Sequence, residues 1–82
     1  MEIEQARDIL ELDIEHEYEN CFAEGIIILY RYVKGKFNYT LAHEQLWFGN
    51  FEETVQQMTE LEVHKLAKYG WFDDEESWSL YS

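Results

Sequence analysis

One cysteine, Cys21, stands in a chain of 82 residues, so no disulfide bridge within the chain can stabilise the fold. The cysteine and the histidines also lack the spacing of a zinc site. The fold must therefore rest on apolar burial, which is demanding at this size. Hydrophobic residues make up 46% of the chain and aromatic residues 17%, which predicts one globular domain over residues 1–82.

Acidic residues give the chain a formal net charge of −12, and this charge is unevenly distributed. Residues 1–24 carry −8 and residues 44–82 carry −7, whereas residues 25–43 carry +3 from Arg31, Lys34 and Lys36. This balance argues against direct contact with nucleic acid or with an anionic membrane, because both bind basic patches. The first residues lack the basic and apolar regions of a secretory signal, so we expect a cytoplasmic protein.

The first part of the chain has the apolar period of a helix. Apolar residues recur every three or four positions, at Ile3, Ala6, Leu10, Ile14, Tyr18 and Phe22. This period predicts an amphipathic helix over residues 2–23, with Asn20 as a candidate break and Gly25 at the C-terminal end.

From residue 26 the pattern changes to alternation, and β-branched and aromatic residues become frequent. We therefore predict a strand over residues 26–33, a turn at 34–36, a second strand over 36–41 and a third, short strand over 45–48. Asn50 is then placed to cap a second helix, with Glu53 completing a capping box, and Gly70 is placed to end that helix.

Residues 71–81 alternate around four acids, which predicts a closing β-hairpin. The predicted element order is thus α-β-β-(β)-α-β-β. This order predicts an α+β fold in which two helices pack on one face of a small, mainly antiparallel sheet.

Two groups of acids are the candidate binding residues. On a helix over residues 2–23, five acids would form one line with carboxylates about 5–6 Å apart, close to the spacing of phosphates along a nucleic-acid strand. The second group is the acidic loop of the hairpin. The candidate partner-binding residues are Glu4, Asp8, Glu11, Glu15, Glu19, Asp73, Asp74, Glu75 and Glu76. A solvated face is the alternative interpretation of both groups.

The spacing of residues in the sequence gives little support to catalysis or metal binding. The loop at 73–76 lacks the spacing of a calcium-binding loop, and Trp47 stands where a zinc-protease motif beginning at His43 needs its second histidine. Acids surround Cys21 and would raise rather than lower a thiol pKa. We therefore expect no enzyme, no metal and no cofactor.

These features together predict a binding protein. The leading hypothesis is an acidic inhibitor that mimics nucleic acid and occupies the basic surface of a nucleic-acid-handling enzyme, as anti-CRISPR and anti-restriction proteins of phages do. Exposed aromatic residues beside the acids would anchor it. An immunity protein or antitoxin that neutralises a basic toxin remains an alternative. So does a homo-oligomeric accessory domain, for instance a homodimer in which the basic residues Arg31, Lys34 and Lys36 contact acids of a second copy.

Overall fold

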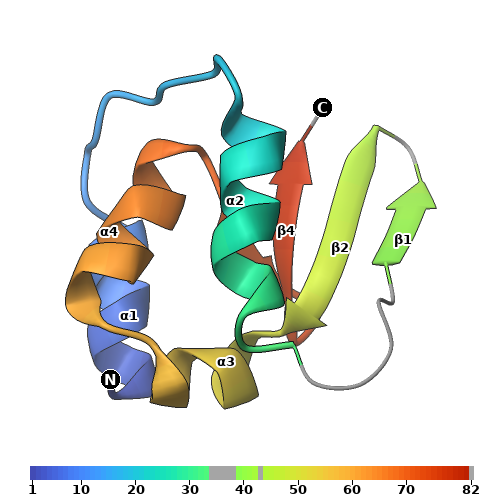
Figure 1. Cartoon of the computed structure of the whole chain (residues 1–82). Helices are drawn as coiled ribbons and strands as arrows, with labels where there is room; N and C mark the ends of the chain where they lie inside the picture. Colours follow the sequence, from blue (N-terminus) through green and yellow to red (C-terminus); the bar gives the residue numbers. More distant parts are fainter. Residues whose placement is uncertain (34–38, 43, 82) are drawn as a thin grey trace.

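The computed structural model describes residues 1–33, 39–42 and 44–81 (Figure 1). Within these residues the chain forms helices and strands in the order α-α-β-β-α-α-β-β. The elements are α1 (Ile3–Leu10), α2 (Cys21–Tyr30), β1 (Tyr39–Ala42), β2 (Gln45–Asn50), α3 (Phe51–Gln57), α4 (Glu60–Lys68), β3 (Phe72–Asp74) and β4 (Ser77–Tyr81).

The strands form an antiparallel sheet in the order β1-β2-β4-β3, and the helices gather on one side of it (Figure 1). The predicted α+β class with helices against an antiparallel sheet is therefore confirmed. Register places Leu46 opposite Leu80 and Phe48 opposite Trp78. These four side chains are buried, so this face of the sheet meets the helices and forms the core.

The helix predicted over residues 2–23 is wrong beyond Leu10. α1 ends there, and residues 11–20 follow an irregular path before α2 begins at Cys21. Three pairs of acids would lie one turn apart if the helix continued, Glu11 with Glu15, Glu15 with Glu19, and Asp13 with Glu17. Each such like-charge pair disfavours the helix. The repulsion is one physical reason for the break.

The strand predicted over residues 26–33 is also wrong, because residues 21–30 form α2. Gly25, expected to end the first helix, is buried within α2 instead. A methyl group at this position would overlap the indole of Trp71, which donates a hydrogen bond from Nε1 to the carbonyl of Cys21 at 3.0 Å. Glycine thus lets the helix approach the indole closely, and this tertiary contact outweighs the β propensity of the isoleucines.

The later part of the chain follows the sequence pattern more closely. The side chain of Asn50 caps α3 by accepting a hydrogen bond from Glu53 N–H at 2.9 Å, and Gly70 follows α4 with a φ of +87°. The single helix predicted between them is instead two helices, because Thr59 begins α4 with a capping box to Glu62.

The strands predicted at 45–48 and in the hairpin over 71–81 are confirmed by β2, β3 and β4. The second predicted strand overlaps β1, while its first residues and the turn at 34–36 lie outside the described residues. In the described part of the chain, no helix has both the length and the apolar composition needed to cross a bilayer.

Candidate acidic interface

The link between α1 and α2 carries a carboxylate at every second position. We call residues 11–19 the acidic segment, in which the acids are Glu11, Asp13, Glu15, Glu17 and Glu19. Figure 1 shows the segment as a drawn-out loop that rises beside α4 and crosses to the start of α2. All five acids are exposed, and no lysine or arginine lies within the segment.

Contacts near its middle fasten the acidic segment to the rest of the molecule. The side chain of Ile14 packs against the core. The backbone N–H of Glu17 donates to the carbonyl of Lys68 at 2.8 Å, and the Lys68 Nζ lies 3.0 Å from Glu17 Oε2. The hydrogen bond and the charge of Glu17 raise the pKa of Lys68, so this lysine stays charged. The segment is thereby fixed at its middle.

The other four acids of the segment are not neutralised by a described ion-pair partner. Among the described residues, no lysine, arginine or histidine forms an ion pair with Glu11, Asp13, Glu15 or Glu19. A carboxylate in water without a partner remains strongly solvated and unneutralised. The segment therefore presents a concentrated negative field to any approaching molecule.

The predicted continuous line of acids along one helix does not exist. Glu4 and Asp8 lie on α1 and Glu11 caps its C-terminal end, whereas Glu15 and Glu19 lie in the irregular part of the acidic segment. The line is thus broken where α1 ends. The candidate interface is therefore a loop rather than a row of acids along a helix.

Arg7 neutralises part of the predicted interface. Its guanidinium lies 3.2 Å from Asp73, 3.3 Å from Glu4 and 3.7 Å from Glu52, and 5.6 Å above the ring of Phe51. The hydrogen bond to Asp73 raises the pKa of Arg7 further above its ordinary value. Arg7 of α1 therefore joins Glu52 of α3 and Asp73 of β3, and less of the charge of Glu4 and Asp73 faces a partner.

The hairpin acids also divide into acids that are engaged within the fold and acids that face solvent. The carboxylate of Asp74 accepts hydrogen bonds from Gln45 Nε2 at 2.9 Å and from Trp47 Nε1 at 3.1 Å. Glu75 and Glu76 are exposed in the turn, with φ values of 49° and 66°. Of the four predicted hairpin acids, these two face solvent, and their role in binding stays a prediction.

Glu62 is a buried carboxylate that serves the fold. Burial alone would raise its pKa, but hydrogen bonds from the backbone N–H of Thr59, from the Tyr32 hydroxyl and from the Thr59 hydroxyl outweigh burial, with help from the charge of Arg31. The pKa of Glu62 therefore lies below its ordinary value. The hydrogen bond to Glu62 in turn raises the pKa of Tyr32, with burial adding to the effect.

The sequence predicted exposed aromatic residues beside the acids, but its helical period assigned Tyr18 to the apolar side of a helix. Tyr18 lies between Glu17 and Glu19 and is 74% exposed, and Tyr81 of β4 is 66% exposed. The alternation of acids from Glu11 to Glu19 was the signal for an extended segment, and it would have placed Tyr18 outside a helix.

The described residues contain no group of three histidine, cysteine, aspartate or glutamate side chains arranged to hold a metal ion. No known family model, curated protein or solved structure matches this chain.

Proposed function

We propose that this chain is an acidic binding protein that occupies a basic nucleic-acid-binding surface of another protein. The observation that carries the proposal is the acidic segment, with alternating carboxylates of which four have no described ion-pair partner. An inhibitor of a nucleic-acid-handling enzyme, such as an anti-CRISPR or anti-restriction protein, would act in this way. The encounter would take place in the cytoplasm, where such enzymes work.

The spacing of the charges supports this proposal. The chain turns at residues 11–12 and 19–20, and residues 13–18 between them form neither turn nor helix. Where such a chain is extended, alternate residues are about 6–7 Å apart, which is roughly the interval of phosphates along an extended strand. A basic channel that accepts a phosphodiester backbone could then accept the segment. Long-range attraction between the two charged surfaces would accelerate the encounter.

An aromatic side chain within the charged surface supports a specific rather than a diffuse contact. Tyr18 projects from the acidic segment and is largely exposed. Exposed tyrosines supply a large, rigid contact area, and tyrosine is enriched among the residues that dominate binding energy. The acids would then steer the partner and Tyr18 would help to hold it.

The test is capture of a partner by three versions of the chain, immobilised and exposed to nuclease-treated cell lysate. The versions are the wild type, a segment variant (Asp13→Asn, Glu15→Gln, Glu19→Gln) and a control (Glu2→Gln, Glu24→Gln, Glu53→Gln) with the same change of net charge. All six acids are exposed. Proteins are eluted by a salt gradient, and added DNA or RNA is used as a competitor.

We expect the wild type and the control to retain a nucleic-acid-handling protein that rising salt and added nucleic acid release. The segment variant should lose it, because the contacts to phosphate-binding residues are lost. Equal retention by both variants would contradict the proposal, as would a captured protein that nucleic acid fails to displace. A small basic toxin in the eluate would favour the immunity-protein alternative.

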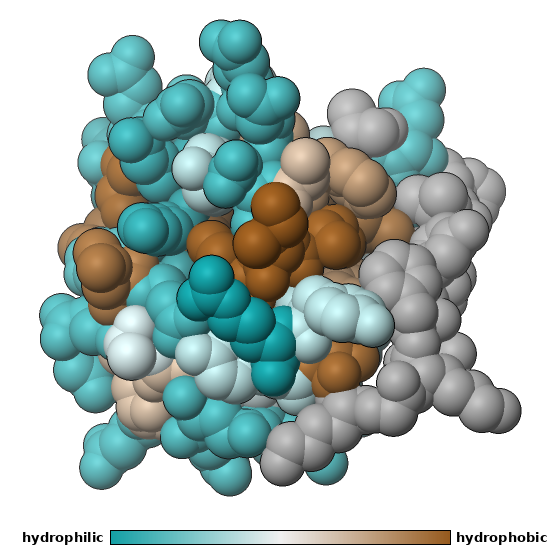
Figure 2. All heavy atoms as spheres, in the orientation of Figure 1, coloured by the Kyte–Doolittle hydropathy of each residue, from teal (hydrophilic) through white to brown (hydrophobic). Residues whose placement is uncertain are grey.

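A second candidate function, self-association, is favoured by the exposed apolar side of α2. Its members are Phe22, Ala23, Ile26, Ile27 and Tyr30, which we call the α2 face. Phe22, Ile27 and Tyr30 are each more than half exposed, at 53%, 56% and 58%. Figure 2 shows a hydrophobic patch over α2 in the centre of a largely hydrophilic view.

The charges beside the α2 face suit a second copy. Glu24 and Arg31 lie seven residues apart on the same flank of the helix. A two-fold axis that pairs two antiparallel α2 helices would bring Glu24 of one copy near Arg31 of the other. The exposed apolar area is on the order of 300 Å² per copy, which is below the roughly 600–1,000 Å² per partner of a stable specific interface, so the dimer would be weak.

Sedimentation of the wild type and of Ile27→Asp over a range of protein concentrations tests self-association. The wild type should approach twice the monomer mass at high concentration, and Ile27→Asp should remain a monomer. We expect the repulsion between two copies of net charge −12 to exceed the attraction of two Glu24–Arg31 pairs, so added salt, which screens both, should strengthen this dimer. A dimer held by the basic residues Arg31, Lys34 and Lys36 should instead weaken in salt.

A further inference from the structure

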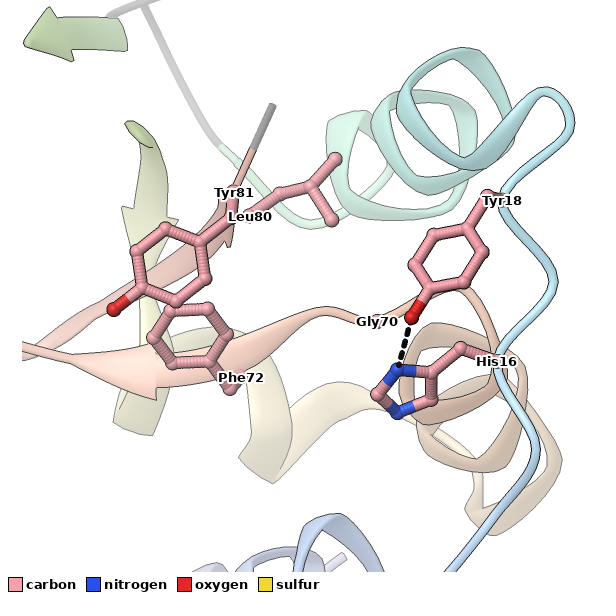
Figure 3. A pocket seen from close by; sticks show the side chains of 6 residues that line it. All are labelled: His16, Tyr18, Gly70, Phe72, Leu80 and Tyr81. Atoms are coloured by element: carbon pink, nitrogen blue, oxygen red, sulfur yellow. Dashed lines mark hydrogen bonds between the residues drawn. The ribbon is translucent and has the colours of Figure 1, made fainter. Parts of the chain in front are cut away.

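A cleft of about 320 Å³ opens between the acidic segment and the C-terminal hairpin (Figure 3). Its lining residues are His16, Tyr18, Gly70, Phe72, Leu80 and Tyr81. In Figure 3, His16 and Tyr18 form one wall, Phe72 and Tyr81 form the opposite wall, and Leu80 and Gly70 lie between them. The cleft therefore joins two regions that are far apart in the sequence.

The walls of the cleft are largely aromatic and are held in place. The rings of Phe72 and Tyr81 lie 4.9 Å apart between centroids and are tilted by 31°. On the other wall, the Tyr18 hydroxyl forms a hydrogen bond with His16 Nδ1 at 3.5 Å, and the two rings meet edge to face. Aromatic faces carry partial negative charge and attract cations that lie above them.

The charges around the cleft point to a cationic ligand. Glu15 and Glu17 flank His16 in the sequence, and Glu17 and Glu19 flank Tyr18. Lys68 lies nearby beside Glu15, His16 and Glu17, and its ammonium already pairs with Glu17. No acid is among the described residues that line the cleft itself, but the adjoining segment is negatively charged, so its field disfavours a phosphate or carboxylate and favours a cation, which the rings also attract.

We propose that this cleft receives an arginine side chain of the basic partner. The inference rests on the proposed function for the identity of the partner, but the recognition itself depends on the aromatic walls. A guanidinium is flat and weakly hydrated, so it stacks on aromatic rings at less cost than an ammonium ion. The acidic segment would thus steer the partner by charge, and the cleft would select arginine within its basic surface.

The first experiment uses small probes and the intact chain. N-acetyl-arginine methylamide, its neutral citrulline isostere and N-acetyl-leucine methylamide are titrated separately at constant ionic strength, with NMR shifts as the readout. The arginine probe should shift residues that line the cleft and bind about three- to tenfold more tightly than citrulline. Equal shifts with citrulline or leucine would overturn the proposal, because the cleft would then be a general apolar pocket.

Variants separate the cleft from the general acidity of the surface. Tyr18→Leu with Tyr81→Leu removes two exposed rings, and Tyr30→Leu removes a similarly exposed ring from α2 as a control. The double variant should weaken the arginine probe about three- to tenfold, and the control should leave it unchanged. Unchanged binding by the double variant would overturn the proposal. The far-ultraviolet circular dichroism of each variant checks that the fold persists.

Capture of the partner distinguishes failure of this inference from failure of the proposed function. If the segment variant loses the partner while the tyrosine double variant keeps it with full affinity, the proposed function stands and the cleft inference falls. If the arginine probe binds the cleft but the segment variant still captures every partner, the cleft stands and the proposed function falls. Loss of the partner in both variants supports both.

Discussion

The backbone N–H of Glu17 donates to the carbonyl of Lys68 across 2.8 Å, and the Lys68 ammonium returns to the Glu17 carboxylate across 3.0 Å. Lys68 is the last residue of α4, where helical carbonyls lack partners within the helix. The acidic segment therefore satisfies the end of α4 while α4 positions the segment. The two elements depend on each other locally.

Removal of the ionic half of this contact should loosen the segment without unfolding the protein. We expect Lys68→Met to increase hydrogen exchange at the Glu17 amide severalfold, because only the backbone hydrogen bond then remains. The midpoint of urea unfolding should change little, since exposed ion pairs contribute weakly. Hydrogen exchange measured by NMR checks this, with Lys65→Met as the control. Unchanged exchange at Glu17 would show that the ionic contact has no such role.

Gly25→Ala should destabilise the protein although alanine favours helices. The added methyl group would overlap the buried indole of Trp71, and overpacking of this kind costs about 1–3 kcal/mol. The gain in helix propensity recovers at most about 1 kcal/mol. Urea unfolding followed by tryptophan fluorescence measures the change. The exposed neighbour serves as a control, because Glu24→Ala should shift stability by about 0.5 kcal/mol or less. Equal stability of Gly25→Ala and wild type would contradict the close approach.

Glu62→Gln should destabilise the protein in a pH-dependent way. The depressed pKa of Glu62 means that its contribution is present above the ordinary glutamate pKa and is lost as pH falls through the lower folded value. At neutral pH the loss of the charged acceptor should cost about 1–3 kcal/mol. Urea unfolding at pH 7, 5 and 3 measures both proteins. The difference in the free energy of unfolding between wild type and Glu62→Gln should become smaller at low pH. A difference that stays constant with pH would point to a cause other than charge.

The hairpin turn should gain stability from residues that tolerate positive φ. Glu75 and Glu76 both have positive φ, which type I′ turns require and which asparagine and glycine adopt readily. We expect Glu75→Asn with Glu76→Gly to raise the free energy of unfolding by about 1–2 kcal/mol. Glu75→Gln with Glu76→Gln removes the same charges and keeps the strain, so it isolates the electrostatic part. An equal gain in both double variants would assign the effect to charge.

Local signals in the sequence predicted the start of α3 and the end of α4 correctly. Asn50 caps α3 and Gly70 follows α4 because a cap and a left-handed turn depend on one or two residues. The run from Ile26 to Leu29 was misassigned because an unbroken apolar run is compatible with a buried helix and with a strand. The contact between Gly25 and Trp71 decides between them, and the two residues are 46 positions apart.

The candidate site likewise has some features that the sequence could predict and others that it could not. The exposure of Glu11, Asp13, Glu15 and Glu19 follows from their charge and was predictable. The engagement of Asp73 by Arg7 and of Asp74 by Trp47 depends on how α1 and the strands pack, so composition alone could not reveal it.

The attachment of the acidic segment through Ile14 and the backbone of Glu17 has a consequence for how this protein can change. The side chains at positions 11, 13, 15 and 19 contribute no described contact to the core, so substitutions there are nearly neutral for folding. The charges at these positions can therefore be changed while the rest of the fold stays the same. A library of variants at these four positions is a direct route to redirecting the protein towards a different target.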